Sequence, residues 1–252
     1  MKRLKLGALL VSLAISALLT GCDSDNNNRA DVPDNPAPAP APAPAPEPEP
    51  VTVGFEVTVT NLTHGQPLSP VAVVAHDGTL RGWTVGQPSS NGLELLAEGG
   101  DNSEFVMAFE DAGSFASVSA EAPLGPGGTE SLSLSFAEEE GVLLTVATML
   151  VNTNDAFSGV TRVDVSTLAV GESLQRLAPI YDAGTEFNSE LAGTIPGPAD
   201  GGEGFNAERE DVNFVARHPG IVSRADGYAE SVLDQSHRFD QPAMLLSITR
   251  TE

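Results

Sequence analysis

The feature that most limits the fold is a succession of short segments in which apolar and polar residues alternate. Residues 55–60, Phe-Glu-Val-Thr-Val-Thr, place every second side chain on one face, as a half-buried strand requires. Further segments of this kind are 71–75, 115–120, 131–136, 142–150, 160–165 and 243–249. Turn-forming residues such as Asp77-Gly78 separate them. The pattern predicts an all-β domain.

Two further patterns in the sequence refine this prediction. Residues 142–150 are nearly all apolar, which predicts a central strand buried on both faces. Residues 91–99 instead have helical spacing, with Asn91 as the expected cap, and a second short helix is expected over 102–111 with Phe105, Ala108 and Phe109 facing inward. Many short strands with one or two helices in a crossover indicate an antiparallel β-sandwich.

The first 22 residues have the zones of a bacterial export signal. Three early cations precede an apolar run over 6–19, and Leu19-Thr20-Gly21-Cys22 looks like a lipobox. We therefore predict a signal peptide over 1–21, lipidation of Cys22 and anchoring in the cell envelope, on the periplasmic side or at the cell surface. The alternatives are a plain secretory signal or an uncleaved membrane helix, although the run is shorter than the roughly 20 residues of a span.

Residues 22–50 are expected to be a tether. An Asn-rich stretch is followed by alternating proline over 36–50, which prevents helix and favours an extended polyproline II rod. The alternative is a proline-rich ligand for another domain. The remaining residues, 51–252, are enough for one β domain with its own core.

Charge and cysteine use exclude some functions. The signal contains three of the 12 cations, so nine arginines face 35 acidic residues, a net charge of −26. This field repels nucleic acid, so we expect no nucleic-acid partner; it attracts divalent cations and basic partners. A salt-adapted surface is the other explanation. Because Cys22 is the only cysteine, no intramolecular disulfide can form.

Three ordered motifs resemble the spondin N-terminal domain family. The first comprises His76-Asp-Gly and residues 85–99, which include Ser-Ser-Asn-Gly-Leu and end in Leu96-Ala97-Glu98-Gly99. The second is residues 149–160, Met-Leu-Val-Asn-Thr-Asn-Asp-Ala-Phe-Ser-Gly-Val, and the third is Tyr181-Asp182-Ala183-Gly184-Thr185-Glu186. The resemblance implies a β-sandwich similar to the synaptotagmin-type calcium- and lipid-binding domains, with one calcium ion at the loops of one end.

Position by position, the resemblance places acidic calcium ligands at Asp155, Asp182 and Glu186. Calcium prefers six to eight hard oxygen ligands, which carboxylates supply. Two positions depart from the family pattern. Ala156 stands where tryptophan is usual, and Glu186 replaces an aspartate. The alternative is that these acids are solvated loop residues.

Catalytic motifs are missing from the sequence. It contains neither a G-x-S-x-G elbow nor H-E-x-x-H, and the four histidines lack metal-ligand spacing. We therefore expect a non-catalytic, lipid-anchored module for adhesion or interaction with an extracellular or envelope protein or glycan. The alternatives are a metal-free structural lipoprotein and a module that binds glycan or matrix.

Overall fold

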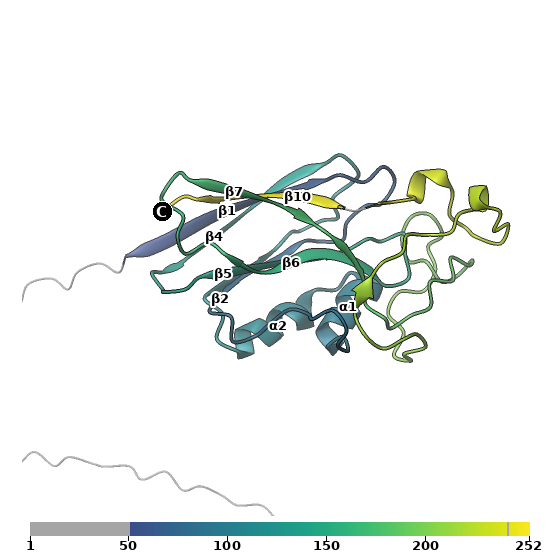
Figure 1. Ribbon diagram of the computed structural model, residues 1–252, viewed down its shortest axis with the longest axis horizontal. Helices are drawn as coiled ribbons and strands as arrows, with labels where there is room; N and C mark the ends of the chain where they lie inside the picture. Colours follow the sequence, from purple (N-terminus) through teal and green to yellow (C-terminus); the bar gives the residue numbers. More distant parts are fainter. Residues whose placement is uncertain (1–50, 241) are drawn as a thin grey trace, which may run out of the picture. The chain divides into compact units, whose positions relative to one another are not determined.

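Two antiparallel sheets pack face to face in the computed structural model, and two helices cover the outer face of one of them (Figure 1). The structure describes residues 51–240 and 242–252. The predicted signal peptide, Cys22 and the tether lie outside these residues. Among the described residues, no helix has the length and apolar character needed to cross a membrane. The all-β sandwich predicted from sequence is confirmed.

The first sheet has four strands in the order β4-β1-β10-β7. Its strands are β1 (Thr52–Asn61), β4 (Thr129–Ala137), β7 (Ser173–Ala178) and β10 (Met244–Arg250). The alternation that predicted β1 buries Phe55, Val57 and Val59 almost completely, at 1%, 0% and 0% exposure. These side chains belong to the main core, which lies between the sheets.

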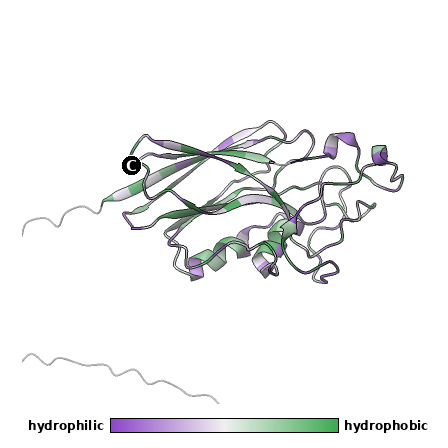
Figure 2. Cartoon of the chain, viewed as in Figure 1, coloured by the Kyte–Doolittle hydropathy of each residue, from purple (hydrophilic) through white to green (hydrophobic). Residues whose placement is uncertain are grey.

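The second sheet has six strands in the order β3-β2-β5-β6-β8-β9. Its strands are β2 (Ala72–His76), β3 (Ala116–Ser119), β5 (Leu143–Met149), β6 (Ala156–Asp164), β8 (Ile180–Asp182) and β9 (Ala216–Arg217). β5 is central and is buried on both faces, as its apolar sequence predicts. This sheet can be apolar on both faces because the helices cover its outer face (Figures 1 and 2).

The helices α1 (Asn91–Gly99) and α2 (Ser103–Asp111) form a second core with this sheet. Trp83 packs edge-on against Phe157 of β6, with 5.1 Å between ring centroids. Gly159 makes this close approach possible, because a Cβ there would lie against the Val146 carbonyl and the Trp83 ring. Phe105 and Phe109 face inward as predicted, but Ala108 is exposed.

The cap of α1 differs from the prediction by one residue. Ser90, in extended conformation, accepts a hydrogen bond from the Leu93 amide at 3.2 Å, so Ser90 rather than Asn91 is the N-cap. The helix ends at Gly99, and Gly100 takes the left-handed conformation, with φ of 70°.

Replacing Ser90 with alanine should lower the free energy of unfolding by about 1 kcal/mol, because the Leu93 amide loses its acceptor. Urea denaturation checks this result. Ser133→Ala is the matched control, since Ser133 is exposed on β4 and caps no helix. Equal unfolding midpoints for the two variants would contradict the assigned cap.

Three strands of the structure were not predicted, and three others, β1, β4 and β6, begin before the residues predicted for them. β6 begins at Ala156 instead of residue 160, and the unpredicted strands are β7, β8 and β9. β8 and β9 are only three and two residues long. Long loops cover residues 183–215 and 218–243. The second of them contains the 3-10 turns Arg224–Asp226 and Gln235–His237. A small third core of Ile195, Ile221 and Leu233 holds these loops together.

The two ends of the sandwich differ in content. At one end, the start of β1 lies beside the last residues of the chain, where the Thr251 amide donates to the Gly54 carbonyl at 2.8 Å. The long loops gather at the other end, here called the loop pole (Figure 1). The turn that joins β5 to β6 and the end of β8 also lie at the loop pole, so strands of the core support whatever these segments carry.

Candidate metal centre

Strand pairing brings two of the predicted carboxylates together at the loop pole. Ala156 of β6 pairs with Asp182 of β8, which places Asp155 beside Asp182. Glu186 follows Gly184, whose φ of 72° turns the chain sharply after β8. A Cβ at Gly184 would collide with the backbone of Phe214, so glycine fits both the turn and the close approach.

Asp155 is fully buried and has one oxygen paired and one unpaired. Its Oδ2 accepts hydrogen bonds from the backbone amides of Thr185 at 2.9 Å and Glu186 at 3.2 Å. Its Oδ1 is buried and has no hydrogen-bond partner among the described residues. An unpaired carboxylate oxygen in the interior is costly unless a proton or a cation satisfies it.

Glu186 and Glu98 contribute two more unpaired oxygens. Glu186 Oε2 and Glu98 Oε1 are buried without a hydrogen-bond partner in the described part of the chain. The other oxygen of Glu98 accepts from the Asn206 amide at 2.9 Å. The Thr185 hydroxyl, which donates to Asp155 Oδ2 at 3.3 Å, also lies near Glu98 and so connects it to this group. Glu98, Asp155, Asp182 and Glu186 are called the carboxylate cluster below.

Glu98 was not among the predicted ligands. It is fully buried near the end of α1, although glutamate is usually exposed on a helix. The available signal was its place within Leu96-Ala97-Glu98-Gly99, a motif of the resemblance that turns out to supply an acid as well as helix packing.

Asp182 is already engaged by hydrogen bonds within its own loop. Its Oδ1 accepts from the Gly184 amide at 2.8 Å, and its Oδ2 accepts from the Asn188 side chain at 2.7 Å. Both oxygens therefore have a donor, in contrast to the unpaired oxygens of Asp155 and Glu186. Asp182 lies in the cluster, but its lone pairs are less free to take a cation.

Burial and mutual repulsion raise the pKa values of the whole cluster. Desolvation, together with the charges of Asp182 and Glu98, raises the pKa of Asp155 to about 7. Desolvation and the charges of Glu98 and Asp155 raise the pKa of Glu186 to about 8. Burial also raises the pKa values of Asp182 and Glu98. Without a cation, the cluster must therefore retain protons near neutral pH.

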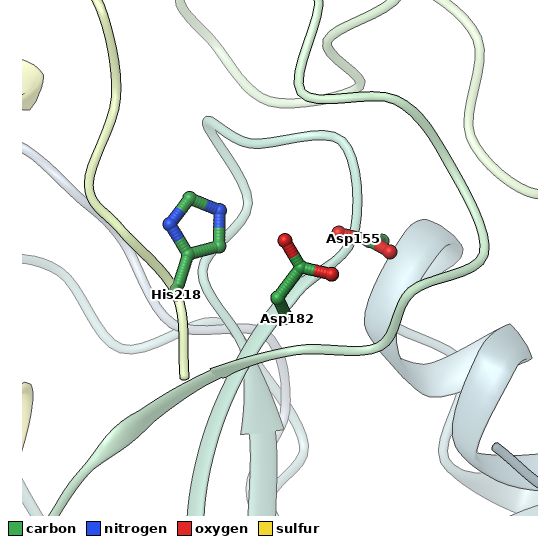
Figure 3. Close-up of side chains that lie close together, drawn as sticks. All are labelled: Asp155, Asp182 and His218. Atoms are coloured by element: carbon green, nitrogen blue, oxygen red, sulfur yellow. The ribbon is translucent and has the colours of Figure 1, made fainter. Parts of the chain in front are cut away.

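His218 lies beside the cluster, which sequence spacing did not predict. One ligand atom each from Asp155, Asp182 and His218 lies within 4.8 Å of the others, with Asp182 between the other two (Figure 3). The His218 Nδ1 accepts from the Gly220 amide at 3.0 Å, so its Nε2 carries the proton and donates to Asn188 at 2.9 Å. Desolvation lowers the pKa of His218 to about 4. Both ring nitrogens are used, so His218 orients Asn188 and, through it, Asp182.

A loop over residues 203–214 closes the cluster from the side of α1. Arg209 forms an ion pair with Glu94 and donates from Nε at 2.9 Å, one helical turn before Glu98. The amides of Glu210 and Asn213 donate to the carbonyls of Thr185 and Gly184, at 2.9 and 2.7 Å. The loop is thus bonded both to α1 and to the turn that carries Glu186.

The donor set fits a hard divalent cation. Three buried carboxylate oxygens from α1, the β5–β6 turn and the loop after β8 have no partner among the described residues, and all are oxygen ligands of the kind calcium prefers. Thiolate is absent from the described chain, and the nearby imidazole is occupied by other bonds. The alternative state of the same residues is a proton-sharing carboxylate group.

No model of a known protein family matches the chain, and a search of curated proteins likewise found no match. The spondin resemblance therefore stays a prediction from the motifs.

Proposed function

We propose that this chain is an exported, lipid-anchored β-sandwich that binds one calcium ion and serves as a non-catalytic adhesion or interaction module. The observation that carries the proposal is the set of three buried, unpaired oxygens on Glu98, Asp155 and Glu186. A cation beside Asp155, whose ligand atom lies within 4.8 Å of those of Asp182 and His218, would offset the repulsion that raises the pKa values of Asp155 and Glu186. The spondin resemblance supports the same ion at the same loops.

In this proposal, calcium acts as a structural clamp. Asp155 lies in the turn before β6 and Asp182 at the end of β8, and their ligand atoms lie within 4.8 Å of each other, so calcium bound between them would hold these two segments together; Glu98 on α1 and Glu186 after β8 would add charge around the ion. The 203–214 loop is hydrogen-bonded to α1 and to the loop after β8, through Asn206 to Glu98 and through Glu210 to Thr185. Calcium would therefore order this loop, although the loop itself supplies none of the three unpaired oxygens.

The clamp would present a docking surface at the loop pole. Three phenylalanines there, Phe187, Phe205 and Phe214, are 56%, 44% and 41% exposed. Phe187 directly follows Glu186. Phe205 and Phe214 adjoin Asn206 and Asn213, whose amides bond Glu98 and Gly184. Exposed aromatic side chains are typical anchors of protein interfaces. The strongly acidic chain favours a basic partner, and the N-terminal lipid would keep the module at the envelope.

Calorimetric titration of the purified protein with calcium, at constant ionic strength set with sodium, tests the function. We expect saturable binding of one ion and at least tenfold weaker binding by Glu98→Gln, because the variant loses a charged ligand while keeping the side-chain shape. Glu56→Gln, an exposed acid on β1, is the matched control and should bind like the wild type. Absence of saturable calcium heat would favour the metal-free structural lipoprotein instead.

A further inference from the structure

A second candidate site lies away from the carboxylate cluster's unpaired oxygens, where the edges of the two sheets meet. A hollow of about 440 Å³ is lined by Leu177, Pro179, Arg217, His218 and Pro242. It is bounded by β7, the edge strand of the four-stranded sheet, and by β9, the edge strand of the six-stranded sheet. Its volume falls within the roughly 300–1,000 Å³ of small-molecule sites.

The walls of this hollow are mostly apolar and remain open to solvent. Leu177 is 58% exposed, and two prolines complete the apolar lining. Leu177 also borders a neighbouring hollow of about 470 Å³, lined by Gln175, Arg176 and Leu245. The two hollows share Leu177 and together form what we call the edge groove. An apolar surface of this shape favours a ligand with an apolar body.

Two arginine side chains line the edge groove, although the protein as a whole is acidic. Arg217 and Arg176 line it, whereas the whole chain carries a net charge of −23. Within residues 51–240 and 242–252, neither arginine forms an ion pair with a carboxylate; Arg209 and Arg238 do. Two arginines without acidic partners are therefore concentrated at one apolar groove.

Arg217 is held in position by an aromatic stack. Its guanidinium lies 4.6 Å from the centre of the Tyr181 ring, and Tyr181 stacks on Phe157 with 5.2 Å between centroids. Such a cation–π contact leaves the edge of the planar guanidinium free to donate two parallel hydrogen bonds to a carboxylate. The cation is pre-positioned beside the apolar walls.

We propose that the edge groove binds a small amphiphilic carboxylate, with its apolar body against Leu177, Pro179 and Pro242 and its carboxylate on Arg217. The charge complementarity is local, since the overall field of the chain repels anions and only a fixed arginine can offset that repulsion. None of its lining residues supplies one of the unpaired oxygens, but His218 of the groove is connected to Asp182 through Asn188, so binding is measured with calcium removed.

Titration calorimetry with decanoate, below its micelle concentration and in the presence of a calcium chelator, tests the proposal. We expect saturable binding that weakens about tenfold or more in Arg217→Gln, through loss of a charge-assisted contact. Decan-1-ol should bind at least tenfold more weakly than decanoate. Arg81→Gln, an exposed arginine outside the groove, is the matched control and should leave the affinity unchanged.

A second variant tests whether a loss of decanoate binding comes from misfolding. Leu177→Asp places a negative charge on an exposed position of the edge strand, where it should not disturb the core, and it should also reduce decanoate binding about tenfold. Far-ultraviolet circular dichroism confirms the fold of both variants. Unchanged affinity in Arg217→Gln, equal binding of the alcohol, or no saturable binding of decanoate would each overturn the assignment.

Discussion

Asp155→Asn should remove the calcium-dependent rise in melting temperature and, at the same time, stabilise the calcium-free protein. Asparagine can keep the two amide hydrogen bonds that Asp155 Oδ2 accepts, because its carbonyl oxygen can occupy the same position. Its amide group would then lie where the unpaired Oδ1 lies now, and it could donate to a neighbouring carboxylate. The substitution thus removes a buried charge without leaving a cavity.

The expected size of the effect follows from linkage. A cation at 100 times its Kd stabilises the folded state by about 2.7 kcal/mol, which corresponds to roughly 5–10 °C for a domain of this length. Differential scanning calorimetry with calcium and with a chelator measures both halves of the prediction. Asp111→Asn, an exposed aspartate at the end of α2, should keep the full calcium shift. A full calcium shift in Asp155→Asn would remove Asp155 from the proposed ligands.

The second large effect is a loss of stability of the calcium-free protein as the pH rises from 6.5 to 9. The pKa values of Asp155 and Glu186 are raised to about 7 and about 8, above the ordinary values of 3.8 and 4.5 that apply to the unfolded chain. In this window the folded state holds protons that the unfolded state has already released. The stability from these groups is complete below the ordinary values and is lost as pH passes 7 and 8.

Each proton that only the folded state holds lowers the stability by about 1.4 kcal/mol per pH unit, and the slope levels off above pH 8, where both groups have ionised in both states. The lower limit of pH 6.5 avoids the titration of His218, whose pKa is lowered to about 4 and whose contribution has the opposite sign between that value and 6.5. Melting temperature in a chelator, followed across the window, checks the slope. Calcium should flatten it, because the ion replaces the protons, and Asp155→Asn should reduce it. A melting temperature that stays constant or rises would contradict the proton-holding cluster.

The strands that sequence predicted best are those whose environment is reflected in their own residues. β1 is half-buried and alternates, whereas β5 is buried on both faces and is continuously apolar. β7 was missed because it is an edge strand: its sequence Ser-Leu-Gln-Arg-Leu-Ala is largely exposed and has no clear period. β8 and β9 are too short for any pattern, and only the pairing of β8 with β6 and of β9 with β8 defines them as strands.

The candidate site was predictable only in part for the same reason. Family motifs placed Asp155, Asp182 and Glu186 at the loops of one end, and the structure brings all three into the carboxylate cluster. The burial of Glu98 depends on the packing of α1 and on Asn206, which lies more than a hundred residues further along the chain. His218 reaches Asp182 only through Asn188. These contacts between distant segments leave no local signal in the sequence.

The arrangement of the two ends of the sandwich has a mechanical consequence for the tethered adhesion module proposed above. In that proposal, an anchor ahead of residue 51 would pull on the start of β1, and a partner held at the loop pole would pull from the opposite end. The load would run lengthwise along β1, which pairs with β4 on one side and β10 on the other. Because antiparallel hydrogen bonds lie perpendicular to the strands, this tension shears both ladders and loads their bonds together, instead of unzipping them one after another.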